Sequence, residues 1–348
     1  MEKDLKRERI FYLDFMRVTA MFSVIILHVA AYFLDEQSIG SYEWNVMTIY
    51  DSFVRFSVPL FVMISGVLWL DSRKKVSLKK IYKKNILKLV ISFAFWSIIY
   101  AILETLFLGE TSINEFVWKC IEGHYHMWFL YMIVGLYIVT PLIRKITNDE
   151  KLTKYFLIIS LITGICIETI KSVHIFARVI KVSEKFNIYI GMGYVFYFVL
   201  GYYLSKKRVS KGVSKVIYIL GIISAFVIFF LTRYSSLKSG KLVEDYFNYL
   251  NLFVLAESVA AFVFIKNMSE FLYQKERAVK CISKISVYCF GIYLIHDLAI
   301  QLLLLFNFKS TSFNPAFSIP IIAVIVFIIS FVLVFLIGKV KGADKYII

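Results

Sequence analysis

Ten apolar runs of about 20 residues recur along this chain of 348 residues. A run of that length, wound as an α-helix at about 1.5 Å per residue, crosses the roughly 30 Å of hydrocarbon in a bilayer. The runs use up nearly the whole chain, and 59% of its residues are hydrophobic, which is too apolar for a water-soluble globule. The sequence therefore predicts an all-α polytopic membrane protein, a bundle of about ten transmembrane helices formed by one membrane-embedded domain over residues 1–348, with no separate soluble domain. The predicted spans are 11–34, 47–70, 86–108, 126–145, 154–173, 187–205, 213–232, 247–266, 286–307 and 318–339.

Lysine and arginine are segregated by loop. Segments such as MEKDLKRER, DSRKKVSLKKIYKK and SKKRVSKGVSK are basic, whereas LDEQSIGSYEWN and GETSINEFVWKCIEG are acidic or balanced. This alternation follows the positive-inside pattern and predicts that both termini are cytoplasmic. The net charge of +16 therefore reflects membrane topology, and we expect no nucleic-acid partner. The segment 171–185, KSVHIFARVIKVSEK, breaks the pattern and is either a weak point in this topology or a basic outer surface.

Two features argue against cleavage of a signal peptide and against a metal site or disulfide. The first crossing is too long for a signal-peptide core and has no convincing cleavage site after it, so we expect it to stay attached. The cysteines have no metal-like spacing, and we expect neither a disulfide nor a metal site. The four cysteines are Cys120, Cys166, Cys281 and Cys289.

The first crossing carries three polar groups that hydrocarbon disfavours. A charged side chain inside a membrane helix costs at least about 2.5–3.5 kcal/mol, so such residues usually face the bundle interior and serve a function. Arg17 and His28 are eleven residues apart, which at about 100° per residue places them on one face and roughly 16 Å apart along the axis. Asp14 lies one turn before Arg17. The structural alternatives are an Asp14–Arg17 ion pair that anchors the helix end and a histidine hydrogen-bonded to a neighbouring helix.

The second crossing contains an arginine at about the depth of His28. Pro59 follows Arg55 by four residues in RFSVPLFVMISG. Because proline lacks an amide hydrogen, the carbonyl of Arg55 loses its helical partner and the helix bends there. A free carbonyl and a cation would then lie beside a polar cavity. The alternative is a structural kink whose arginine reaches outward to lipid headgroups.

Two later crossings carry further polar groups. The fourth begins GHYHMWFLY, which places His126, Trp128 and Tyr131 at the outer surface. Tryptophan and tyrosine there are also the expected interface anchors of any membrane protein. The ninth contains YLIHDLAI, with His296 and Asp297 near mid-membrane. Adjacent helical residues point about 100° apart, so these two cannot face the same partner, and a structural hydrogen bond between helices is an equal alternative.

Several of these motifs resemble those of the acyltransferase 3 family of integral membrane acyltransferases. The first-helix segment LDFMRVTAMFSVIILH, the Arg and Val-Pro-Leu-Phe run of RFSVPLFVMISG, and the later HMWFLYMIVGLYIVTPLI, YVFYFVLGYYL and YLIHDLAI are similar to family signatures in order and spacing. The resemblance extends over about residues 9–340. It is closest to members that O-acetylate bacterial surface polysaccharides or their lipid-linked precursors.

The resemblance implies transfer of an acyl group, commonly acetyl from acetyl-CoA, to a sugar hydroxyl by a multi-pass protein of the bacterial cytoplasmic membrane. The implied partners are a surface glycan or lipid-linked sugar and membrane lipid, and a homo-oligomer is compatible with the sequence. Many members have an arginine before the third helix, whereas this chain has KKIYKKNILKL with Asn85 and lysines. Lysines would act as point charges without the planar fork of arginine. The family's appended SGNH-type hydrolase domain has no counterpart here.

Acyl transfer to a hydroxyl needs a base, a group that stabilises negative charge and a holder for the anionic donor. We assign His28 as the base and Arg55 as the cation that stabilises negative charge or keeps the imidazole neutral, and we place Asp14 and Arg17 with them in the catalytic set. Whether the imidazole attacks the acyl carbon itself or only takes a proton stays open. The predicted CoA-binding residues are Arg17, Lys79, Lys80, Lys83 and Lys84. The predicted substrate-binding residues are His126, Trp128, Tyr131, His296 and Asp297.

Two other functions fit an intramembrane set of Asp, Arg and His. A secondary transporter of a small organic ion or sugar derivative uses such groups as proton relays, and often repeats them in its second half. Residues 187–340 contain no second Asp-x-x-Arg…His pattern, which argues modestly against such a repeat. A non-catalytic membrane component, with polar residues that fix helix packing, is the third reading.

Overall fold

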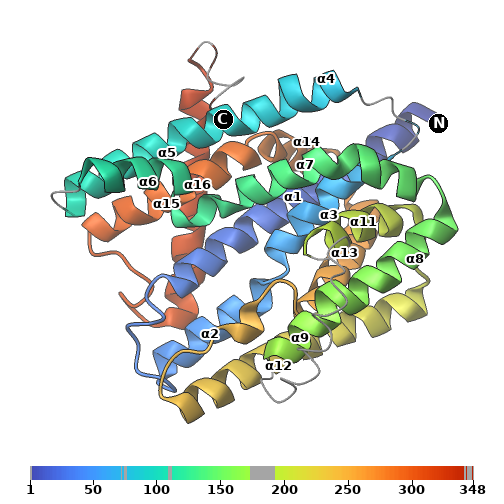
Figure 1. The fold of residues 1–348 in the computed structure, drawn as a ribbon. Coiled ribbons are helices and arrows are strands. Elements are labelled where there is room, and N and C mark those ends of the chain that lie inside the picture. The colour runs from blue at the N-terminus through green and yellow to red at the C-terminus, as the bar shows by residue number, and fades with distance from the viewer. Residues whose placement is uncertain are drawn as a thin grey trace.

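The computed structural model describes residues 2–71, 73, 77–108, 112–172, 193–340, 342 and 347. Within those ranges every regular element is a helix, and short loops join the helices into one bundle (Figure 1). The predicted all-α fold is therefore confirmed. The long helices and their flanking segments have the following bounds: α1 Glu2–Ala31, α2 Tyr42–Val54, α3 Ser57–Trp69, α4 Leu78–Lys80, α5 Leu87–Leu108, α6 Ile113–Glu122, α7 Trp128–Thr147, α8 Glu150–Ser160, α9 Ile167–Ser172, α11 Val195–Lys206, α12 Lys211–Ser239, α13 Leu252–Leu272, α14 Glu276–Ser286, α15 Cys289–Leu305 and α16 Pro315–Ile337.

Nine of the ten predicted spans coincide with apolar helical segments among the described residues. Eight described segments are long and apolar enough to cross a membrane, and the pair α14 and α15, bent by 67°, makes a ninth if it is one span. The chain is thus an integral multi-pass membrane protein. Of the predicted span 187–205, residues 193–205 are described and contain α11 except for its last residue, whereas 187–192 lie outside the described residues, as does most of the basic segment 171–185. The cytoplasmic location of the termini stays a prediction.

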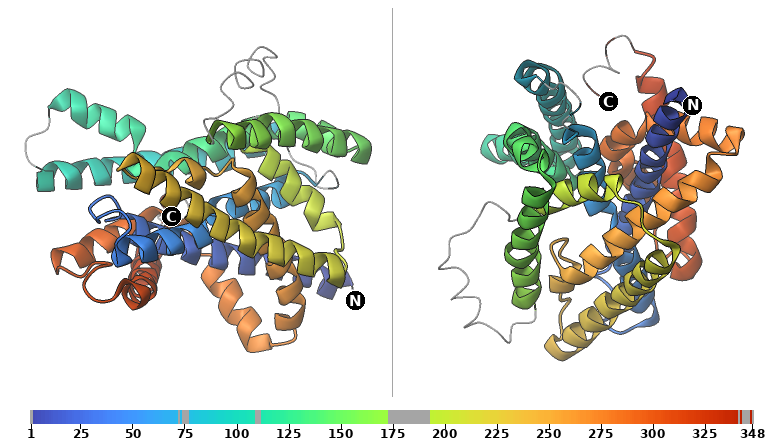
Figure 2. Two further views of the ribbon diagram at one scale, coloured as in Figure 1. Left: turned by 90° about the horizontal axis from the view of Figure 1, so that it is seen from below. Right: turned by 90° about the vertical axis from the view of Figure 1, so that its right-hand side faces the viewer.

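Helix α1 is the central element of the bundle. It packs against α2, α3, α13, α14, α15 and α16. Met16, Ala20, Met21 and Ile25 on this helix are fully buried, and Figures 1 and 2 show its neighbours on several sides. The hairpin of α5 and α6, by contrast, projects beyond the neighbouring helices (Figure 2). Polar groups on α1 therefore face protein over most of the helix.

The second span is broken at the arginine that the sequence singled out. Helix α2 ends at Val54 and α3 begins at Ser57, with Arg55 and Phe56 between them. Pro59 in the first turn of α3 has no amide hydrogen to donate to Arg55. The helical ladder resumes at the next residue, where the backbone N–H of Leu60 donates to the carbonyl of Phe56 at 3.0 Å. The break releases the Arg55 carbonyl and directs the side chain from the junction of two helices.

Helices α3 and α11 approach each other closely through two glycines. A Cβ atom on Gly201 would lie 2.3 Å from the carbonyl oxygen of Met63, and one on Gly66 would lie 1.7 Å from that of Phe198. Both contacts are with backbone, which cannot move as a flexible side chain does. Small residues at membrane helix interfaces permit this kind of approach, in which packing supplies the association energy.

We predict that Gly201→Ala destabilises the bundle by about 1–3 kcal/mol, since the added methyl overlaps the Met63 carbonyl and forces the helices apart. Gly135→Ala in α7 is the matched control, because nothing lies within 4 Å of a Cβ built there. Thermal unfolding in detergent, followed by size-exclusion chromatography of the remaining monodisperse protein, gives the comparison. Equal stability of the two variants would contradict the close packing of α3 and α11.

Candidate functional site

The four histidines among the described residues lie together, although they come from distant parts of the sequence. His28 is on α1, His124 and His126 are in the turn before α7, and His296 is on α15. The ring centroid of His296 lies 5.1 Å from that of His28 and 4.9 Å from that of His126, and His28 and His126 are 6.4 Å apart. The structure therefore brings the predicted base, His28, together with two of the predicted substrate-binding residues.

A tight turn presents two of these histidines. Helix α6 ends at Gly123, which has φ +75°, a backbone conformation that disfavours residues with a Cβ atom. A 3₁₀ turn over Tyr125–Met127 follows, and the N–H of Met127 donates to the carbonyl of His124 at 2.7 Å. The hydroxyl of Tyr293 on α15 donates to the carbonyl of His126 at 2.5 Å. The turn is thereby attached to the helix that carries His296.

The carboxylate of Asp297 is the hydrogen-bonding centre of the cluster. Its residue is fully buried. The hydroxyl of Tyr125 donates to Oδ1 at 2.7 Å, and the side-chain amide of Gln301 donates to Oδ2 at 2.6 Å. Nε2 of His124 lies 3.5 Å from Oδ2. Asp297 and His296 thus face different partners, as adjacent helical residues must, but both belong to one cluster.

His28 opens into a cavity. It lines a pocket of about 330 Å³ with Ala31, Tyr32, His124 and Tyr125. Its Nδ1 lies 3.4 Å from the hydroxyl oxygen of Tyr125. Because that hydroxyl donates its hydrogen to Asp297, its oxygen can accept from Nδ1–H of His28, which leaves Nε2 with the free lone pair. The arrangement can therefore hold one tautomer of His28 and expose a basic nitrogen.

Helix α5 contributes residues that the sequence analysis did not select. The ring of Tyr100 stacks on that of His124 with centroids 4.4 Å apart. A carboxylate oxygen of Glu104 lies 3.5 Å from Nε2 of His124, and the other lies 3.2 Å from the ammonium of Lys119. Glu104 could have been found as a charge within the predicted span 86–108, and Tyr125 as the residue between two histidines.

Arg55 belongs to a separate group of polar and aromatic residues. Its Nη2 is hydrogen-bonded to the buried carboxylate of Asp51, one turn earlier on α2. Its guanidinium lies over the ring of Phe247, with Cζ 4.1 Å from the centroid of that ring and 5.7 Å from the centroid of the Tyr249 ring. In the described part of the chain, no hydrogen bond or ring contact joins Arg55 to His28. The interaction between the two side chains is electrostatic and acts without direct contact.

A second carboxylate lies near this arginine. Glu257 on α13 is 5% exposed, and among the described residues neither of its carboxylate oxygens has a hydrogen-bond partner. The positive charge of Arg55 favours an ionised Glu257, whereas the negative charge of Asp51 disfavours it. Asp51 and Glu257 fall within predicted spans, so their positions could have been read from the sequence as intramembrane charges.

The predicted sugar-binding aromatics lie apart from the histidines. Trp128 packs against the rings of Tyr249 and Tyr194, with centroids 6.0 and 5.7 Å apart, and so adjoins the group around Arg55. Tyr131 is more than half exposed, and its hydroxyl donates to the carbonyl of Ile121 on α6.

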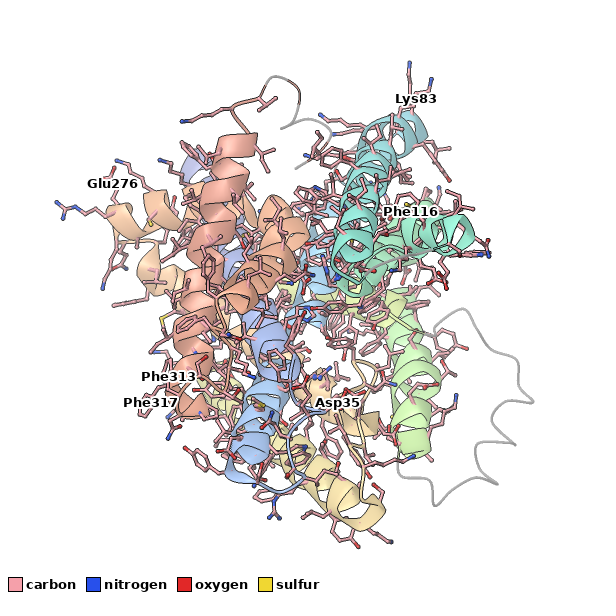
Figure 3. All side chains as sticks on the ribbon, turned by 90° about the vertical axis from the view of Figure 1, so that its left-hand side faces the viewer. Asp35, Lys83, Phe116, Glu276, Phe313 and Phe317 are labelled. Carbon is pink, nitrogen blue, oxygen red and sulfur yellow. The ribbon has the colours of Figure 1, made fainter. Side chains whose placement is uncertain are left out.

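The predicted donor-binding residues lie away from the histidine cluster. Arg17 Nη1 binds Asp14 Oδ1 at 2.7 Å, which is the ion pair considered from the sequence. The four lysines are exposed on α4 and on the π-helical segment Ile81–Ile86 that continues it into α5. Lys83 projects from the periphery of the bundle (Figure 3). None of the described contacts joins these lysines to Arg17. They are Lys79, Lys80, Lys83 and Lys84.

Comparison with known proteins identifies relatives at low identity. Proteins described as probable poly-beta-1,6-N-acetyl-D-glucosamine export proteins, from Staphylococcus aureus strains MSSA476, MW2 and N315, are each 22% identical to this chain over 252 residues, which is 71% of this chain and 70% of theirs. No solved structure matches the chain. The family described as an acyltransferase domain matches residues 10–339. A match over nearly the whole sequence shows that the chain belongs to the acyltransferase 3 family of integral membrane proteins.

Proposed function

We propose that this protein is a membrane O-acyltransferase that moves an acetyl group from acetyl-CoA to a hydroxyl of a cell-surface polysaccharide or its lipid-linked precursor. The observation that carries the proposal is His28 on the wall of a cavity of about 330 Å³, with Tyr125 between it and the buried carboxylate of Asp297. The acyltransferase family supports the reaction class. The relatives named for a polymer of N-acetylglucosamine support a glycan acceptor.

The proton transfer is assigned to His28. Its Nε2 takes the proton of the sugar hydroxyl while the sugar oxygen attacks the thioester carbonyl carbon. The carbon–sulfur bond then breaks, the CoA sulfur leaves with the bonding electrons, and the imidazolium returns the proton to it. Tyr125 accepts the hydrogen bond of Nδ1–H and donates its own hydroxyl hydrogen to Asp297. The position of Asp297 therefore orients the imidazole ring through Tyr125. His28 alone therefore gains and loses the proton.

The donor is proposed to reach His28 from the side of Arg17, which lies near the middle of α1. The two residues are eleven positions apart, or about 16 Å along the helix. Arginine and lysine bind phosphate by charge-assisted hydrogen bonds, and the pantetheine arm of CoA is long and flexible. The exposed lysines of α4 and the π-helical segment are assigned to the CoA phosphates as mobile point charges.

Export of a polysaccharide is the second candidate, because the relatives are named as export proteins. Proteoliposomes that contain the purified protein separate the two functions. They are given acetyl-CoA with a radiolabelled acetyl group and β-1,6-linked N-acetylglucosamine oligosaccharides of one to six rings. A transferase places the label on the sugar, whereas an exporter moves the oligosaccharide across the vesicle wall without labelling it. Transport without label transfer would overturn the proposal.

We predict that His28→Ala lowers acetyl transfer by about 10²–10⁴-fold, the usual contribution of a general base. The His28 side chain lines an open cavity, so its removal should leave the bundle intact. Label transfer to oligosaccharide is measured beside protein level and thermal stability in detergent. Transfer at the wild-type rate by a stable variant would remove His28 as the base.

A second prediction concerns the residues that orient His28. Tyr125→Phe and Asp297→Asn should each lower kcat, and the double variant should be no worse than the more damaged single one, because both residues act through one hydrogen-bond chain. Tyr234→Phe is the control for loss of an exposed hydroxyl on α12. Additive losses in the double variant would show that Tyr125 and Asp297 act independently.

A third prediction tests the donor site. Lys83→Ala combined with Lys84→Ala should raise KM for acetyl-CoA and make it less sensitive to salt, since two charges that attract the CoA phosphates are gone. The matched control is Lys211→Ala with Lys215→Ala, which removes two exposed lysines at the start of α12. An equal change of KM in both pairs would indicate a general loss of positive charge. That result would contradict the assigned donor site.

A further inference from the structure

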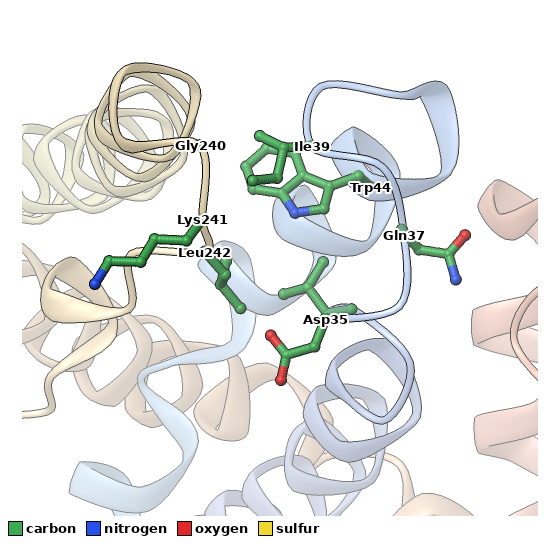
Figure 4. A pocket seen from close by; sticks show the side chains of 8 residues that line it. Asp35, Gln37, Ile39, Trp44, Gly240, Lys241 and Leu242 are labelled. Atoms are coloured by element: carbon green, nitrogen blue, oxygen red, sulfur yellow. The ribbon is translucent and has the colours of Figure 1, made fainter.

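A second and larger cavity lies beside the cavity lined by His28, Ala31, Tyr32, His124 and Tyr125, which we call the histidine pocket. Its volume is about 560 Å³, within the range of small-molecule sites. Three segments enclose it: the loop that follows α1, the first turn of α2 and the end of α12 (Figure 4). The lining residues are Leu34, Asp35, Gln37, Ile39, Trp44, Gly240, Lys241 and Leu242. We call this cavity the outer pocket.

The walls of the outer pocket are fixed by hydrogen bonds. Nε of Arg233 on α12 donates to Oδ1 of Asn45 on α2 at 3.0 Å, which joins the two helices beside the cavity. The side-chain amide of Asn45 donates to the carbonyls of Gly40 and Ser41 at 2.9 and 2.7 Å. A ligand would therefore enter a preformed site and would not have to order these loops on binding.

The indole of Trp44 has a donor with no partner. The residue is fully buried, and Nε1 makes no hydrogen bond to any residue that the structure describes. In Figure 4 this nitrogen is directed toward the side of the cavity on which Asp35 lies. An unsatisfied buried donor costs about 1–3 kcal/mol, and an oxygen of a bound ligand would remove that cost.

The chemistry of the lining suits a neutral sugar ring. Asp35 accepts hydrogen bonds and Trp44 donates one, whereas the side chains of Lys241 and Gln37 extend away from the centre of the pocket (Figure 4). Leu34, Ile39 and Leu242 supply apolar surface. The acidic Asp35 disfavours an anion such as phosphate. A pyranose has hydroxyls on its rim and apolar C–H faces, which matches this mixture.

The two cavities share one short segment of chain. Ala31 and Tyr32 line the histidine pocket, and Leu34 and Asp35 line the outer pocket. Three residues span at most about 11 Å, so the two linings are close. We propose that the outer pocket is a second sugar subsite, which binds a ring of the glycan chain other than the ring that is acylated at His28. The inference rests on the proposed function and adds the place where a second ring of the acceptor binds.

The test measures how acetyl transfer depends on acceptor length. Full-length protein in detergent is assayed with the same ladder of one to six rings. The wild type should have a kcat/KM that rises with length, and Asp35→Asn and Trp44→Phe should each lower that gain by about five-fold, the effect of roughly one hydrogen bond, through KM. Asp35 is exposed, so its variant folds even if loss of the buried Trp44 indole does not permit folding.

The controls are Glu36→Gln, next to Asp35 but outside the lining, and Trp118→Phe on α6. Both should keep the wild-type dependence on length. Binding of the longest oligosaccharide to His28→Ala protein, measured by the change in tryptophan fluorescence, supplies a readout without turnover. Saturable binding that Asp35→Asn weakens supports the subsite. If the wild-type protein then transfers no acetyl, only the proposed function fails. Transfer with wild-type length dependence in both subsite variants would overturn the subsite alone.

Discussion

The buried carboxylate of Asp297 determines how the site is assembled. An ionised group at this depth costs several kcal/mol unless hydrogen-bond donors surround it. Gln301 supplies one donor from the same helix, and Tyr125 supplies the other from the turn between α6 and α7. That turn must therefore stay against α15, and in this position its residues His124 and Tyr125 line the cavity beside His28. The position of the proposed base thus depends on a contact between two other elements.

Much of the fold follows from the sequence because hydrocarbon imposes simple rules. The apolar runs predicted nine spans that the described residues contain wholly or nearly so, as straight, broken or bent helices. The same rules direct intramembrane polar groups to the interior, and His28 and His296 meet there although 268 positions separate them in the sequence. Pro59 marked the break between α2 and α3 because the missing amide hydrogen acts locally.

The sequence did not predict which interior groups become partners. Depth along a helix can be counted in residues, but the rotation of one helix relative to another depends on packing. Arg55 and His28 have similar predicted depths, yet Arg55 is directed to Asp51, one turn away on its own helix. His124 and Tyr125 reach Asp297 only because the chain reverses at Gly123, and nothing in the spacing of those residues specifies α15 as the surface they meet.

The ion pair with Asp51 changes what Arg55 can contribute to the proposed transfer. Its positive charge is offset by a carboxylate in direct contact, so it acts on His28 only through the remaining field, whereas Tyr125 is in a position to hold the ring by a hydrogen bond. In the proposed transfer, the Tyr125–Asp297 pair then orients the imidazole. Because α1 carries Arg17 near its middle and Ala31, which lines the cavity beside His28, at its last residue, a shift of this central helix would move the proposed donor site and the proposed acceptor site together. In the proposed function, one helix packed on most sides therefore carries residues of both the donor site and the acceptor site.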